Sequence, residues 1–69
     1  MKINSTRLHN SNVLLATCDD ARLLQSERDE LMKAETNTNW IKAPTKQETI
    51  ALNRLIERYN TKITDLLWQ

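Results

Sequence analysis

Three basic side chains recur one helical turn apart in the second half of the chain. Arg54, Arg58 and Lys62 are each four residues apart, so on a helix they form a single row. Tyr59 lies beside this row. Like charges at this spacing repel one another weakly, and a bound phosphate would relieve the repulsion through charge-assisted hydrogen bonds. The row indicates an anion site with an aromatic ring nearby. The alternative interpretation is a solvated rim whose cations face the acidic residues of another helix.

Two further pairs of residues could contribute to such a site. Arg7 and His9 lie in the polar first 12 residues, which form either a loose end or an ordered arm that reaches a ligand or a neighbouring subunit. Trp40 and Trp68 either close the two ends of a helical core or offer a stacking surface to a nucleotide base. The sequence leaves both interpretations open for each pair.

The composition argues against catalysis. The 69-residue chain has no glycine, whereas phosphate-binding loops and dinucleotide-binding fingerprints depend on glycine. A catalytic triad needs a base with an orienting partner, and His9 is the single histidine. One histidine and one cysteine do not supply the usual set of four metal ligands. The sequence therefore predicts a protein that is not an enzyme and that uses no metal or cofactor.

Charge and hydropathy restrict the partners. The formal net charge of +1 is too balanced for non-specific DNA binding, which needs a strongly basic face. The longest apolar run, residues 13–16, is far shorter than the roughly 20 residues of a transmembrane helix, and the first residues lack the apolar segment of a signal peptide. A single unpaired cysteine fits a reducing compartment. We expect a cytoplasmic protein that binds neither a membrane nor nucleic acid.

The row of basic residues must be positioned by a helix with a clear start. Thr45 and Glu48, three residues later, match the pattern of a capping box. Apolar side chains then recur at helical spacing, which predicts a helix over about residues 45–68; from Lys46 to Trp68 it spans about 34 Å at 1.5 Å per residue. The apolar stripe consists of Leu52, Leu55, Ile56, Tyr59, Ile63, Leu66 and Leu67.

A first helix is expected over residues 11–36, starting either near Thr17 or at about Ser11, with or without a short N-terminal helix laid across the pair. Residues 37–44 form the connection, because residues 36–39 have poor helix propensity and Pro44 disfavours the α conformation in the residue before it. The first segment has an excess of acidic residues and the second an excess of basic ones, which favours their pairing. The sequence therefore predicts an all-α fold, a single domain built as an antiparallel two-helix hairpin.

The apolar side of the second helix is wider than one partner helix can cover. Its flanks are formed by Ile50, Ile56, Ile63, Leu67 and Trp68. A chain of this length buries only about 60% of the surface that its unfolded form exposes. Without a disulfide or a metal, self-association is the remaining means of stabilising so small a scaffold. We expect the hairpins to assemble as a homo-oligomeric helical bundle.

A run that begins at Pro44 carries a family resemblance. Pro44 is followed by Thr-Lys-Gln-Glu at residues 45–48 and by Ile-Ala-Leu-Asn-Arg-Leu at residues 50–55, and Thr-Arg-Leu-His occupies residues 6–9. These segments resemble the helical-hairpin family of phage anti-defence sponges, which sequester cyclic oligonucleotide signals of the CBASS immune system. The resemblance implies a homo-oligomer, often a hexamer, that binds cyclic nucleotides at subunit interfaces. The ligand-binding residues would then be Arg7, His9, Lys46, Arg54, Arg58, Tyr59 and Lys62.

Two functions of different classes follow from these observations. The first is a phage-type anti-defence protein that sequesters a cyclic nucleotide immune signal in the host cytoplasm, without catalysis. The alternative is a protein-protein interaction module or inhibitor that docks its amphipathic second helix in a groove of a host protein. The sequence leaves the ligand and the number of subunits open.

Overall fold

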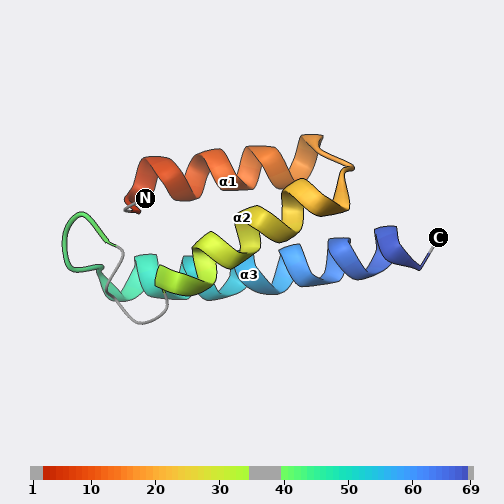
Figure 1. Ribbon diagram of the computed structural model, residues 1–69. Coiled ribbons are helices and arrows are strands. Elements are labelled where there is room, and N and C mark those ends of the chain that lie inside the picture. The colour runs from red at the N-terminus through yellow and green to blue at the C-terminus, as the bar shows by residue number, and fades with distance from the viewer. Residues whose placement is uncertain (1–2, 35–39, 69) are drawn as a thin grey trace.

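The computed structural model describes residues 3–34 and 40–68, and within these ranges the chain forms three helices and one isolated β-bridge. Helix α1 spans Ser5–Thr17, α2 spans Ala21–Lys33 and α3 spans Lys46–Leu67. Helices α1 and α3 run in the same direction, and α2 returns obliquely from the end of α1 to the start of α3 (Figure 1). The molecule is elongated, with extents of 38 × 16 × 16 Å. The prediction of an all-α fold is confirmed.

The segment predicted as one helix over residues 11–36 is divided into two. Helix α1 ends at Thr17, and a break at residues 18–20 separates it from α2. Asp20, rather than Thr17, caps α2, because its side chain accepts a hydrogen bond from the backbone N–H of Arg22. Helix α2 ends at Lys33, and the remaining predicted residues 35 and 36 lie outside the described residues. The alternative of a helix that passes through from about Ser11 is therefore wrong, and the alternative of a start near Thr17 is closer, because α2 begins at Ala21.

Residues 3–12 pack against the rest of the fold, so their interpretation as a loose end is wrong. The Asn4 side chain caps α1 by accepting a hydrogen bond from the backbone N–H of Arg7 at 2.9 Å. Ile3 forms a parallel β-bridge with Trp40, and its carbonyl accepts the N–H of Ile41 at 2.9 Å. The contacts of Ile3 hold the segment before α1 against residues 40 and 41, which precede α3. The N-terminal helix is therefore present and longer than the short helix expected.

Helix α3 begins with the predicted capping box. The Thr45 hydroxyl accepts the backbone N–H of Glu48 at 3.1 Å, and the Glu48 carboxylate accepts the backbone N–H of Thr45 at 3.0 Å. Residues 40–44 precede the helix without helical structure, as expected before and at Pro44. The turn predicted at residues 36–39 lies outside the described residues. None of the described helices combines the length and the apolar content that crossing a membrane requires.

Helix α3 contributes more buried apolar residues than either of the other helices, and it contacts both α1 and α2. The buried apolar residues are Ile3, Leu8, Leu15, Leu24, Leu31, Ala34, Trp40, Leu52, Leu55, Ile56, Tyr59 and Ile63. Ile56 and Ile63, predicted as flanks for a second copy, are therefore covered within the chain. The chain has a third helix, so α3 packs against both α1 and α2, whereas a two-helix hairpin would supply a single partner helix. Ile50, Leu67 and Trp68 remain exposed.

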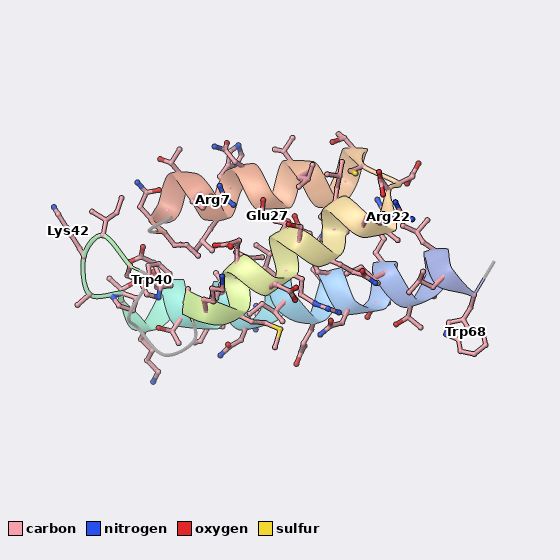
Figure 2. All side chains as sticks on the ribbon, viewed as in Figure 1. Arg7, Arg22, Glu27, Trp40, Lys42 and Trp68 are labelled. Atoms are coloured by element: carbon pink, nitrogen blue, oxygen red, sulfur yellow. The ribbon has the colours of Figure 1, made fainter. Side chains whose placement is uncertain are left out.

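The two tryptophans have different environments. Trp40 is buried, and its Nε1–H donates to the carbonyl of Ala34 at 2.8 Å, so it closes one end of the core. Trp68 follows the last turn of α3, is 84% exposed, and extends beyond the body of the molecule (Figure 2). The interpretation that each tryptophan closes one end of the core is correct for Trp40 and wrong for Trp68.

Candidate anion-binding groove

A groove runs along the surface between α1 and α3. Its first hollow, with a volume of about 270 Å³, is lined by Leu8, His9, Asn12, Ala51, Arg54, Leu55 and Arg58. A second hollow of about 490 Å³ shares Arg58 with the first and is lined by Leu15, Ala16, Glu57, Arg58, Thr61, Lys62 and Asp65. We call these two hollows together the α1–α3 groove. It brings His9 together with the predicted row Arg54, Arg58 and Lys62.

The polar side chains of the groove are positioned by the buried residues next to them. Leu8 and Leu15 are seven residues apart on α1 and are both buried, which fixes the face that α1 turns toward α3. His9 follows Leu8 directly and lies at the edge of this face. On α3, the buried Leu55 lies between Arg54 and Arg58. The apolar stripe thus places two guanidinium groups one turn apart at the rim of the core.

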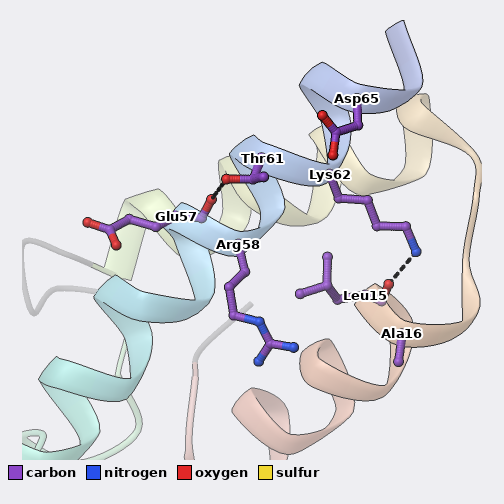
Figure 3. A pocket seen from close by; sticks show the side chains of 7 residues that line it. All are labelled: Leu15, Ala16, Glu57, Arg58, Thr61, Lys62 and Asp65. Atoms are coloured by element: carbon purple, nitrogen blue, oxygen red, sulfur yellow. Dashed lines mark hydrogen bonds between the residues drawn. The ribbon is translucent and has the colours of Figure 1, made fainter. Parts of the chain in front are cut away.

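The two arginines differ in their contacts. Arg58 extends from α3 toward α1 (Figure 3). Its Nη1 donates to the Asn12 side-chain oxygen at 2.9 Å. This bond holds one edge of the guanidinium group in place and uses one of its five N–H donors. Arg54 makes no hydrogen bond and no ion pair with any residue within 3–34 and 40–68. One arginine is therefore oriented in advance, and the other has no partner in the described part of the chain.

Lys62 lines the groove and also connects α3 to α1. Its Nζ donates to the carbonyl of Leu15 in the last turn of α1 (Figure 3). The same ammonium group pairs with the Asp19 carboxylate at 3.4 Å. A cation at the C-terminal end of a helix interacts favourably with the helix dipole and satisfies a carbonyl that lacks an intrahelical partner. Lys62 therefore fastens the end of α1 to α3, and its charge is already engaged at one end of the groove.

No protein-family model, curated protein or solved structure matches the chain. What the groove can bind follows from the contacts, burial and charge of its own side chains. Guanidinium groups are planar and donate hydrogen bonds in pairs, which suits phosphate and carboxylate oxygens. The exposed Ala51 supplies apolar surface next to Arg54 and Arg58. The largely buried Leu8 and Leu55 lie at the base of the hollow. The combination fits a ligand with a phosphate and a flat apolar part.

Three residues predicted as ligand-binding lie outside the groove. Arg7 forms an ion pair with Glu27, partly buried between α1 and α2 (Figure 2). Tyr59 is fully buried, and its hydroxyl donates to the carbonyl of Ser11 at 2.5 Å. Lys46 is exposed at the first residue of α3 and lines neither hollow. These side chains are therefore poor candidates for ligand contacts in the folded chain.

Asn12 is the groove residue that the sequence did not indicate. It lies on α1, three residues after His9, and accepts the Arg58 hydrogen bond. No spacing pattern marks it, because the polar N-terminal segment contains several asparagines and no strong apolar periodicity. Only the position of α1 against α3 distinguishes Asn12 from the others.

The raised pKa of Tyr59 predicts that the protein loses stability at alkaline pH. Burial, together with the nearby Glu27 carboxylate, raises the pKa of Tyr59 from 10.0 to about 12. The folded state therefore keeps the phenolic proton at pH values where the unfolded state has lost it, and stability falls as the pH rises from 10 to about 12.

Urea unfolding followed by circular dichroism at several pH values measures this effect, with Tyr59→Phe as the control. Below pH 10, the free energy of unfolding of wild type is expected to exceed that of Tyr59→Phe by about 1 kcal/mol, because only wild type makes the buried hydrogen bond to Ser11. Above pH 10 the difference should shrink, since the variant has no group to ionise at this position. Parallel stability curves for the two proteins would contradict the assignment.

Proposed function

We propose that the protein is a non-catalytic binding protein that captures a small anionic ligand of the cyclic-oligonucleotide type in the α1–α3 groove. The proposal depends on one observation: Arg54, Arg58 and His9 line the same hollow, and Arg54 has no partner among the described residues. Two cations in one row repel each other unless an anion lies between them. A bound phosphate would supply that charge.

The chemistry of the groove favours a nucleotide over a simple anion. Each phosphate of a cyclic oligonucleotide can accept paired hydrogen bonds from a guanidinium group, and Arg58 is oriented for this by Asn12. The exposed Ala51 and the accessible edges of Leu8 and Leu55 can contact a base or a ribose. Capture alone needs no general base or nucleophile. The resemblance of residues 44–55 to the phage anti-defence sponges supports the same ligand class, with sequestration in the cytoplasm of the infected cell as the biological role.

Self-association is part of the proposal. The groove is open along one side, and Ile50, Leu67 and Trp68 remain exposed at the two ends of α3. A second copy that covers these side chains would remove apolar surface from water and could close the groove over its ligand. The pair α2 and α3 would then form the hairpin around which the copies assemble as a bundle.

Isothermal titration calorimetry with cyclic di- and trinucleotides tests the proposed ligand class. We expect a saturable heat signal with at least one of them at micromolar protein concentration. A linear nucleotide of the same base composition serves as the control, since it has the same bases and a different phosphate geometry. The absence of heat with every cyclic nucleotide would exclude the proposal.

A second candidate function is docking on a protein partner, and the exposed end of α3 favours it. Leu67 is 61% exposed and Trp68 is 84% exposed, and tryptophan is enriched among the residues that dominate binding energy at protein interfaces. If this end is a docking site, Trp68→Ala will abolish retention of a stoichiometric host protein. Purified protein that carries an ultraviolet-absorbing ligand and no protein partner would favour nucleotide capture instead.

A further inference from the structure

The break between α1 and α2 is made by residues that also occur inside helices. Residues 18–20 are Cys, Asp and Asp, and neither glycine nor proline lies between Ser5 and Lys33. Cys18 and Asp20 nevertheless have extended backbones, with φ −105° and ψ 131° for Cys18 and φ −93° and ψ 108° for Asp20. Intrinsic backbone preference therefore does not require the chain to bend here.

Side-chain contacts hold the break in its observed form. The Cys18 sulfur accepts the backbone N–H of Asp20 at 3.4 Å, and Asp20 caps the N–H of Arg22 at 2.9 Å. Lys62, from α3, donates to the carbonyl of Leu15. In a continuous helix that carbonyl would instead accept the backbone N–H four residues later. The Lys62 contact and a straight α1–α2 helix therefore compete for the same acceptor.

Helix α1 is attached to the rest of the protein by few apolar contacts and several polar ones. The side chains that it buries are Leu8, Ser11 and Leu15, and the Ser11 hydroxyl has no hydrogen-bond partner within the described residues. Its contacts to α3 include those of Ser11 with Tyr59, Asn12 with Arg58 and Ser5 with Glu48. A helix of this kind can detach more readily than one held by a broad apolar face. Once detached, it leaves part of the apolar stripe of α3 uncovered.

We infer that α1 is exchanged between two copies of this chain. The break straightens, residues 5–33 become one helix about 43 Å long, and the α1 segment of each copy packs on α3 of the other. Apart from the contact of Lys62 with the Leu15 carbonyl, which the straight helix replaces, the α1–α3 contacts are formed again, because the partner has the same sequence. Each α1–α3 groove then contains His9 and Asn12 from one copy and Arg54 and Arg58 from the other. The exchange is independent of whether the groove binds an anion.

Two sets of substitutions test the exchange in opposite directions. Asp20→Ala with Lys62→Met removes the α2 cap and the cation that holds the Leu15 carbonyl, so it favours the straight helix. Light scattering during size exclusion should show the mass rise from 8.1 kDa toward twice that value as concentration increases. Lys46→Met, which replaces an exposed lysine on the same helix, is the matched control. It should leave the dependence of molecular mass on concentration as it is in wild type.

Ala21→Pro separates exchange from simple face-to-face pairing. Position 21 is the first residue of α2, where proline is well tolerated, and Asp20 before it already has an extended backbone. In the interior of a continuous helix the same proline would clash with the preceding turn and remove a hydrogen bond. Added to the double variant, Ala21→Pro should return the protein to the monomeric mass.

A refolding experiment tests the exchange of α1 without a destabilised variant. Wild type and Ala21→Pro are each refolded from denaturant at millimolar concentration, and exchange predicts a dimer fraction for wild type alone. Circular dichroism verifies that each protein is helical. Exchange is excluded if wild type and the double variant both stay at 8.1 kDa, or if their dimers persist with Ala21→Pro.

Discussion

Replacing Tyr59 with alanine is expected to lower the free energy of unfolding by about 3–5 kcal/mol, the range for removing a large aromatic side chain from a core. Tyr59 is fully buried on α3, where both other helices pack, and its hydroxyl donates to the carbonyl of Ser11 on α1. At about 0.05–0.15 kcal/mol per residue, a chain of 69 residues has a total stability of roughly 3–10 kcal/mol. The variant should therefore be partly or wholly unfolded at room temperature.

Trp68→Ala provides the matched control for this prediction. It also removes a large aromatic side chain, at the residue that follows α3, but this side chain is 84% exposed. Substitutions of this kind usually change stability by no more than about 0.5 kcal/mol. Urea unfolding of both variants by circular dichroism gives the comparison. A loss below about 1 kcal/mol for Tyr59→Ala would contradict the central position assigned to Tyr59.

Reversing the charge of Arg54 and Arg58 is expected to weaken binding of a cyclic nucleotide by at least about 100-fold. Each charge-assisted hydrogen bond contributes about 1.5–3 kcal/mol, and 1.4 kcal/mol corresponds to a factor of ten in affinity. The double variant Arg54→Glu/Arg58→Glu also places two carboxylates where the phosphates would lie. Calorimetry measures the loss, and circular dichroism verifies that the helices are intact.

The control for the arginine pair changes the charge by the same amount at a different place. Lys42 and Lys46 are exposed beside the start of α3 and line neither hollow of the α1–α3 groove. Charges farther than about 8 Å from the ligand are largely screened at physiological salt, so Lys42→Glu/Lys46→Glu should lower affinity by no more than about threefold. Equal losses in the two double variants would show that binding depends on net charge and not on the groove.

Those parts of the fold that are encoded locally could be predicted from the sequence. The capping box of Thr45 and Glu48 needs only two residues at the right spacing, and the apolar stripe of α3 follows from its periodicity. The N-terminal helix was underestimated because α1 has only Leu8 and Leu15 as buried large side chains along its length. The sequence left open whether a helix starts near Thr17 or passes through from about Ser11, and it could not decide between them, because Lys62, a residue far along the chain, helps to hold the break at residues 18–20.

For the candidate site, the sequence likewise predicted what depends on local spacing and missed what depends on tertiary contacts. The row of Arg54, Arg58 and Lys62 follows from their spacing on one helix, and the structure places all three along the α1–α3 groove. Which side chains near the row remain accessible depends on tertiary contacts that spacing does not reveal. Tyr59 is adjacent in sequence to Arg58 but lies in the core, and Arg7 pairs with Glu27 on α2.

The most direct test of the account is to record nitrogen-15 NMR spectra of labelled wild-type protein during titration with cyclic di- and trinucleotides. The account predicts saturable shifts that cluster at the Asn12 side-chain amide and at Arg54 and Arg58, while residues on the outer face of α2, such as Asp29, keep their positions. Shifts confined to α2 or to Trp68, or a spectrum that no cyclic nucleotide changes, would contradict the claim that the α1–α3 groove captures an anionic ligand.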